Sequence, residues 1–180
     1  MDWMKEVEAA LKARRQVLFS KDSEFLRDLR LLLEEQDHRT VILWALELAG
    51  ETVHTLEERY PGEQRPANVL EAARLWASGK IKMPEAKAAI LECHAMAKEL
   101  SSPEDIALCH GVGQACSTVH TAGHGIGFPI YELTALVRRF GLTQCREPVE
   151  SRKQEYLERL RYWKEHMEDN HGEWAPFLTK

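Results

Sequence analysis

Apolar residues recur every three or four positions along most of this sequence, and proline and glycine fall between the resulting segments, apart from one glycine-rich stretch. This spacing places the apolar side chains of each segment on one face of an α-helix. The strict alternation of apolar and polar residues that is typical of half-buried strands does not occur. We therefore predict an all-α fold, a single-domain helical bundle of about seven to eight helices.

The segment that begins near Asp37, a good helix N-cap, and continues to about Tyr60 is the most apolar. Residues 41–46, VILWAL, are apolar all round, so we expect this helix in the centre of the bundle. A buried strand is the competing interpretation of so short a run, but the helical spacing continues to Leu56. The other predicted helices span about residues 3–18, 23–33, 66–79, 84–100, 104–126, 131–141 and 148–168.

The glycine-rich stretch covers residues 109–127, CHGVGQACSTVHTAGHGIG. On a continuous helix over 104–126, small residues fall along one side, namely Ala107, Gly111, Ala115, Thr118, Ala122 and Gly125. Such a stripe lets two helix backbones approach closely. The glycines lack the spacing of a phosphate-binding loop, so we interpret them as packing residues.

Histidines occupy another face of the same predicted helix. His120 and His124 are four residues apart, which is a spacing that can present two imidazoles to zinc, and His110 lies on the same side. A metalloprotease helix also needs a glutamate next to its first histidine, and this sequence has none there. With His94 from the preceding helix, His120 and His124 are predicted to form a polar cluster that fixes helix register or holds a ligand. If the chain binds a metal, these three are the candidate ligands.

Cysteine spacing and charge exclude several classes of protein. The four cysteines form no C-x-x-C pair, and we interpret Cys109 and Cys116 as small core residues rather than nucleophiles. The net charge is −5, with acids and bases interleaved, so a nucleic-acid-binding stripe is not expected. No apolar run is long enough for a membrane span, and the N-terminal residues do not resemble a signal peptide. We expect a cytoplasmic protein with no cofactor.

The middle of the chain, residues 38–137, resembles the immunity-five-like proteins of bacterial polymorphic-toxin systems. The most distinctive part is RPANVLEAARLWASGKI, residues 65–81. Further matching elements are an Ala-rich helix that ends in His94–Ala95 and a later small-residue helix that carries His120 and His124. Gln64 stands where the family pattern has an acidic residue.

The resemblance implies a non-enzymatic binding protein that neutralises a cognate toxin. It divides the chain into an N-terminal helical extension (1–36), an immunity-like helical core (37–141) and a C-terminal helix and tail packed on that core (142–180). The candidate binding residues are His94, His120, His124, Arg65, Arg74 and Trp76. We expect Trp76 in the core, and Arg65 and Arg74 in ion pairs with Glu47 or Glu71.

Two alternatives stay open at this point. The first is a metal-binding helical-bundle protein or enzyme that uses His94, His120 and His124. The second is a structural module whose small-residue stripe packs between subunits of a homo-oligomer. The only acids on the predicted helix 104–126 are Glu104 and Asp105, far from its histidines, which favours the binding protein over an enzyme.

Overall fold

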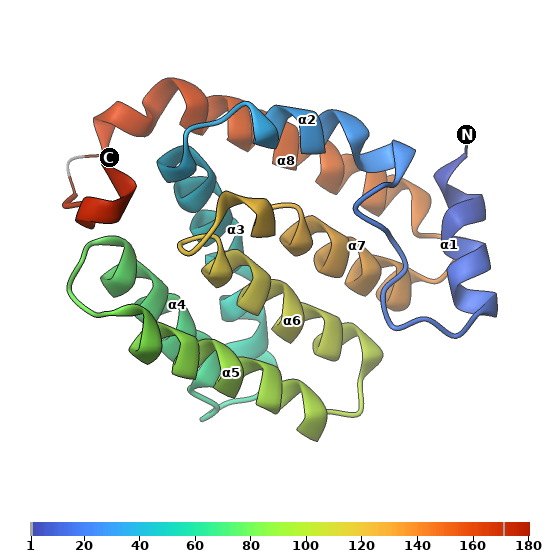
Figure 1. Ribbon diagram of the computed structural model, residues 1–180. Helices are drawn as coiled ribbons and strands as arrows, with labels where there is room; N and C mark the ends of the chain where they lie inside the picture. Colours follow the sequence, from blue (N-terminus) through green and yellow to red (C-terminus); the bar gives the residue numbers. More distant parts are fainter. Residues whose placement is uncertain (1, 171) are drawn as a thin grey trace.

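The computed structural model describes residues 2–170 and 172–180, and in these residues it contains α-helices and short 3-10 turns but no strand (Figure 1). The α-helices are α1 (Trp3–Lys12), α2 (Arg27–Glu34), α3 (His38–Arg59), α4 (Arg65–Ala77), α5 (Met83–Glu99), α6 (Pro103–Ser117), α7 (Gly127–Phe140) and α8 (Arg146–His166). This confirms the predicted all-α bundle. No helix of the described residues is long and apolar enough to cross a lipid bilayer.

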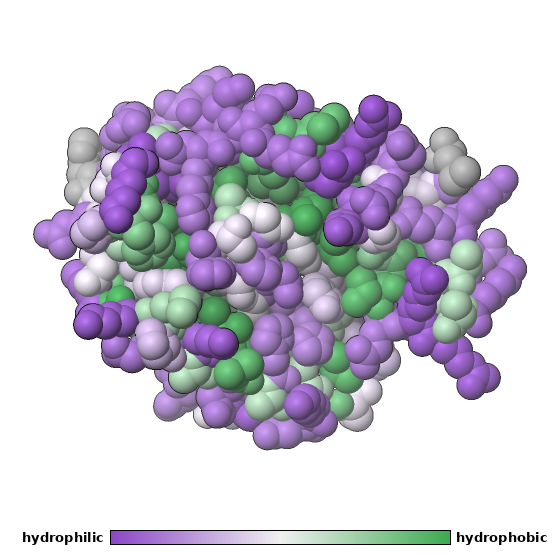
Figure 2. Space-filling model, in the orientation of Figure 1, coloured by the Kyte–Doolittle hydropathy of each residue, from purple (hydrophilic) through white to green (hydrophobic). Residues whose placement is uncertain are grey.

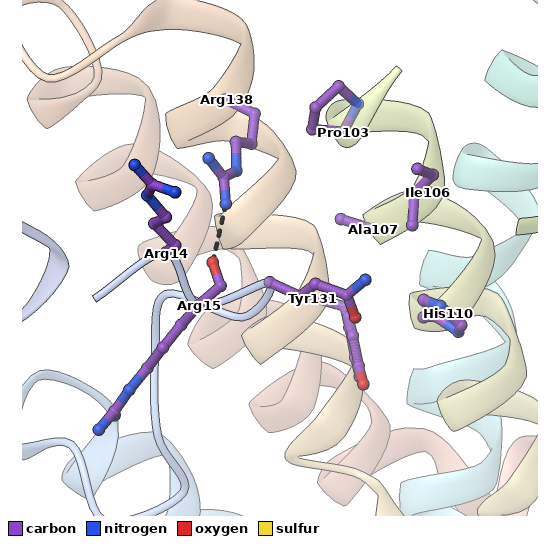
Figure 3. Close-up of a pocket in the computed structure, with 9 residues that line it drawn as sticks. Arg14, Arg15, Pro103, Ile106, Ala107, His110, Tyr131 and Arg138 are labelled. Carbon is purple, nitrogen blue, oxygen red and sulfur yellow. Dashed lines mark hydrogen bonds between the residues drawn. The ribbon is translucent and has the colours of Figure 1, made fainter. Parts of the chain in front are cut away.

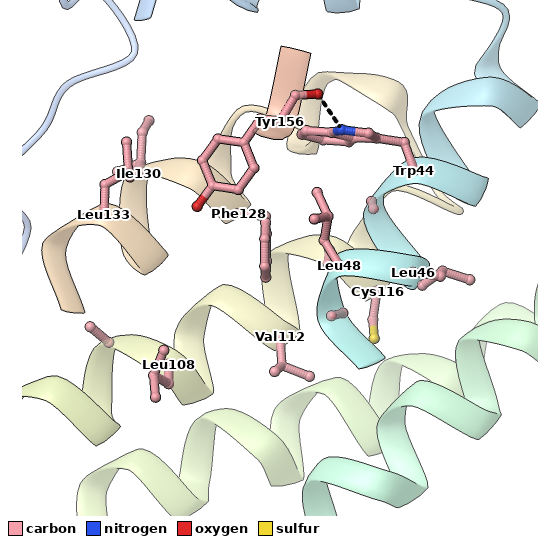
Figure 4. Close-up of a cluster of buried hydrophobic side chains, with 14 of the residues drawn as sticks. Trp44, Leu46, Leu48, Leu108, Val112, Cys116, Phe128, Ile130, Leu133 and Tyr156 are labelled. Carbon is pink, nitrogen blue, oxygen red and sulfur yellow. Dashed lines mark hydrogen bonds between the residues drawn. The ribbon is translucent and has the colours of Figure 1, made fainter. Parts of the chain in front are cut away.

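Helix α3 lies at the centre, as its apolar sequence predicted, and packs against α4, α6 and α8. The carboxylate of Asp37 caps its first turn by accepting a hydrogen bond of 2.8 Å from the backbone N–H of Arg39. Trp44 is fully buried, and its indole N–H donates to the backbone carbonyl of Tyr156 in α8 at 3.0 Å (Figure 4). Trp44 therefore joins α3 to α8, which lies more than a hundred residues further along the chain.

Helix α6 ends at Ser117, so the predicted continuous helix over 104–126 is wrong in its last nine residues. Hydroxyl groups compete with the helical hydrogen bonds at this point. Ser117 donates to the carbonyl of Gly113 at 2.8 Å, and Thr118 donates to the carbonyl of Ala115 at 2.6 Å. The chain then turns through the 3-10 segment Ala122–His124 before the next helix begins.

Helix α7 begins at Gly127, which places Pro129 in its first turn. A proline is well tolerated there because the N–H that it lacks has no intrahelical acceptor. Pro129 therefore helps to start a new helix. Helices α6 and α7 lie side by side (Figure 1) and pack closely along their length.

The N-terminal segment also differs from the prediction, because α1 ends at Lys12 and does not reach Leu18. Arg14 has a φ of 54° and closes the helix end, and the N–H of Arg15 donates to the carbonyl of Ala10 at 3.0 Å. The chain then runs extended, and the N–H of Leu18 donates to the hydroxyl of Thr134 in α7 at 3.1 Å. The residues after α1 are thereby fixed against α7.

The two ends of the chain pack on the same bundle. The indole N–H of Trp3 in α1 donates to the carboxylate of Glu150 in α8 at 3.0 Å. After α8, the N–H of Ala175 donates to the carbonyl of Ala77 at the end of α4 at 2.7 Å, and Leu178 is buried. One continuous core includes residues from α1 to the C-terminal segment.

Candidate functional site

Two histidines face each other where α5 packs on α6. The Nδ1 atoms of His94 and His110 are 2.7 Å apart, and the ring centroids are separated by 5.0 Å. The ring of His110 also lies 5.4 Å from the ring of Tyr131 in α7. Gly113 provides the space for His94, because a Cβ atom at that position would lie 2.5 Å from Cε1 of His94. Three helices therefore contribute to this polar cluster.

Burial lowers the pKa of both imidazoles, and the neighbouring His110 lowers the pKa of His94 further. Both rings are therefore predominantly neutral near pH 7. A hydrogen bond between two Nδ1 atoms requires one to carry the hydrogen and the other to accept it. The two histidines thus hold opposite tautomers, and the Nε2 atom of His110 is left for other contacts.

The structure does not bring together the predicted cluster of His94, His120 and His124. Because α6 stops at Ser117, His120 and His124 leave the helix that was expected to carry them. His120 stacks on Trp76, with centroids 6.3 Å apart, and Nδ1 of His124 lies 3.2 Å from the side-chain oxygen of Gln114. Within residues 2–170 and 172–180, no three or more His, Cys, Asp or Glu side chains are grouped to hold a metal ion.

The other predicted binding residues are spread over α4. Arg65 pairs with Glu63 at 2.7 Å and with Glu99 at 2.6 Å, so its expected pairing with Glu47 or Glu71 is wrong. Glu47 instead accepts hydrogen bonds from Arg159 and Trp163 in α8.

Arg74 lines a shallow pocket between α3, α4 and the C-terminal segment, together with Glu47 and Trp174. Trp76 is 5% exposed, which confirms that it is a core residue. Arg74 is exposed, and no ion pair of the described residues joins it to Glu47 or Glu71, so this expected pairing is wrong as well. Neither Arg74 nor Trp76 extends the histidine pair.

The cysteines are core residues, as predicted for Cys109 and Cys116. All four are buried and free. Burial raises the pKa of Cys93 and of Cys109 to about 12, and raises the pKa of Cys116 as well. Their thiols stay protonated at neutral pH, which makes them poor nucleophiles.

A pocket of about 220 Å³ opens beside His110, between the end of α1, α6 and α7 (Figure 3). Its walls are formed by Arg14, Arg15, Gln16, Pro103, Ile106, Ala107, His110, Tyr131 and Arg138. These residues include three arginines and no carboxylate. The pocket could not be predicted from the sequence, because its walls come from three segments that no motif links. The pair Arg14–Arg15, directly after the first helix, was the only local signal.

The described residues thus form an all-α helical bundle with a histidine pair beside a basic pocket. A family model described as Imm-5 like putative immunity protein matches residues 31–161. The match covers most of the chain, and the chain belongs to this family. The matched range extends at both ends beyond residues 38–137, which carry the resemblance described above. No curated protein and no solved structure matches the chain significantly.

Proposed function

We propose that this chain is an immunity protein that binds a cognate bacterial toxin in the cytoplasm of the producing cell. In this proposal it neutralises the toxin by stoichiometric association and catalyses no reaction. The observation that carries the proposal is the family match over residues 31–161. The partner is accordingly a toxin protein, and neither a nucleic acid nor a membrane.

A rigid scaffold supports such a role, because a preorganised surface loses little conformational entropy on binding. Ion pairs between helices reinforce the bundle. Arg152 of α8 pairs with Glu51 of α3 at 2.9 Å and with Glu132 of α7 at 2.5 Å, and Arg159 of α8 pairs with Glu51 at 2.5 Å. Three helices are thereby held in a fixed arrangement.

The surface charge also supports the proposal. The chain carries 29 acidic and 24 basic residues, and hydrophilic side chains cover much of the face drawn in Figure 2, where the hydrophobic ones form separate patches. Exposed Glu57 and Glu58 lie near the end of α3. A net negative surface favours rapid association with a basic partner, because complementary charge steers the encounter.

The decisive experiment is co-expression of this chain with the toxin domain encoded beside it in its own genome. We expect growth to be rescued, and an inactivated form of the toxin to bind the purified chain one to one in titration calorimetry. An unrelated toxin domain of similar charge serves as the control. Loss of viability despite confirmed expression of the folded chain, together with no heat of binding, contradicts the proposal.

A further inference from the structure

We propose that the pocket beside His110 is a binding site for a small organic anion. The ligand class is a carboxylate or phosphate group carried on a short apolar or aromatic body. This assignment goes beyond toxin binding and does not depend on it.

The pocket carries positive charge that no neighbouring carboxylate neutralises. Most arginines of the described residues have a carboxylate partner within 4 Å, namely Arg27, Arg30, Arg39, Arg59, Arg65, Arg146, Arg152 and Arg159. Among the ion pairs of residues 2–170 and 172–180, none involves Arg14, Arg15 or Arg138. Arg74, Arg139 and Arg161 are also outside these ion pairs. Three of the six arginines without a carboxylate partner in the described residues therefore line this one concave surface, which favours a bound anion.

Arg138 is held in place at the pocket. Its guanidinium donates to the backbone carbonyl of Arg15 at 2.9 Å, drawn as the dashed line in Figure 3, and the side chain is half-buried. One of its five N–H donors is used in this bond, so others remain for a ligand. A planar guanidinium with two free donors matches the two oxygens of a carboxylate or phosphate. The side chain of Arg15 itself extends away from His110 (Figure 3).

The backbone of Arg14 adopts an unusual conformation at the edge of the pocket. Its φ of 54° lies in the left-handed region, where glycine is the favoured residue after a helix. A side chain in this region adds strain, and strained residues cluster at functional sites. Here the strained position carries a cationic side chain that lines the pocket. Arg14 and Arg138 are therefore the two proposed anion-binding side chains.

The remaining walls define the body of the ligand. Pro103, Ile106 and Ala107 supply an apolar surface from the first turns of α6, and the ring of Tyr131 stands across from them. Ligand sites typically combine such apolar walls with a few placed polar groups. A volume of about 220 Å³ suits a body of roughly one aromatic ring, because a cavity of about 150 Å³ already holds benzene.

The test is a titration of the full chain with phenyl phosphate, followed by the amide and histidine side-chain signals in NMR spectra. We expect saturable shifts around His110 and Tyr131, with a dissociation constant in the millimolar range or below. Arg138→Gln and Arg14→Gln should each weaken binding about tenfold. Arg161→Gln changes an exposed arginine of α8 that forms no ion pair among the described residues, and it should leave the affinity unchanged. Phenol, which lacks the anion, should bind at least about tenfold more weakly than phenyl phosphate.

Several results would overturn the assignment. These are an absence of saturable binding, equal affinity for phenol, or an equal loss of affinity in all three variants. Unfolding midpoints check that each variant is folded, and Arg138→Lys offers a second substitution that keeps the charge but loses the planar fork. The chain is titrated alone, so a failure to neutralise a toxin has no bearing on the result. Where a toxin does bind, loss of phenyl phosphate binding in the complex shows that the toxin covers or fills the pocket, and simultaneous binding shows that the pocket stays open to a free small molecule.

Discussion

The hydroxyl of Tyr156 in α8 donates a hydrogen bond of 2.6 Å to the carboxylate of Glu132 in α7, inside the bundle. Glu132 is 6% exposed and also accepts from Arg152 at 2.5 Å and from Thr52 of α3 at 2.9 Å. Burial, followed by the charge of Glu132, raises the pKa of Tyr156 well above its usual value. Three helices therefore meet at one buried carboxylate. The free-energy cost of burying this charge is offset by its hydrogen-bond and ion-pair partners.

We predict that Arg152→Met lowers the free energy of unfolding by about 3 kcal/mol, because the carboxylate of Glu132 stays buried without its cation. Arg146→Met in the same helix is the matched control. Its side chain is 52% exposed and pairs with Asp2 and Glu150, so a loss below about 1 kcal/mol is expected. Urea unfolding of both variants checks the difference. Equal losses in the free energy of unfolding would show that the buried ion pair contributes no more to stability than the exposed one.

Two glycines of α6 should respond in opposite ways to alanine. At Gly113 a Cβ atom would meet the ring of His94 at 2.5 Å, so Gly113→Ala should destabilise the fold by about 1–3 kcal/mol despite the better helix propensity of alanine. At Gly111 the nearest atom is Cβ of Tyr131 at 3.5 Å, an ordinary contact, and Gly111→Ala should be neutral or stabilising by up to about 1 kcal/mol. Thermal unfolding distinguishes them. A larger loss of stability in Gly111→Ala than in Gly113→Ala would contradict the close contact between Gly113 and His94.

Gly111 and Gly113 also show what the sequence pattern was able to predict. Helical spacing predicted the all-α fold and the central position of α3, because these depend on periodicity within one segment. The same periodicity placed Gly111 in a packing stripe, but it did not identify Gly113, whose need for glycine comes from His94 on another helix. The helix end at Ser117 was missed because it depends on the local hydrogen bonds of two hydroxyl groups. Because the helix was expected to continue, His120 and His124 were predicted to lie beside His94. In the structure the partner of His94 is His110.

The histidine pair should make stability depend on pH. The pKa of His94 and of His110 is lowered in the folded state, so below pH about 6.5 the unfolded chain binds more protons than the folded chain. The free energy of unfolding should therefore fall as the pH falls from about 7.5 to about 5. His94→Gln should reduce this loss, as measured by urea unfolding at both pH values. His54→Gln changes an exposed side chain and is the control; the prediction fails if it flattens the pH dependence as much as His94→Gln does.

Arg14→Gly separates stability from binding at the basic pocket. Glycine adopts a φ of 54° without strain, so this variant should gain about 1 kcal/mol in the free energy of unfolding. It also removes a cationic side chain from the pocket, so its affinity for phenyl phosphate should fall. Arg14→Gln, which keeps a side chain at the same φ, should lose affinity without the gain in stability. A glycine variant that is less stable than the original chain would contradict the strain at this position.

The long-range contacts of α8 also determine when the chain can fold during its synthesis. The ribosome makes this helix after α3 and α7, yet Arg152 and Tyr156 complete the burial of Glu132, and the carbonyl of Tyr156 accepts the indole N–H of Trp44. A nascent chain that has emerged only as far as α7 exposes one side of its central helix and carries an unpaired carboxylate at a position destined for the interior. The emerging polypeptide therefore reaches its final packing only after α8 has left the exit tunnel, and until then it presents an apolar surface to cellular chaperones.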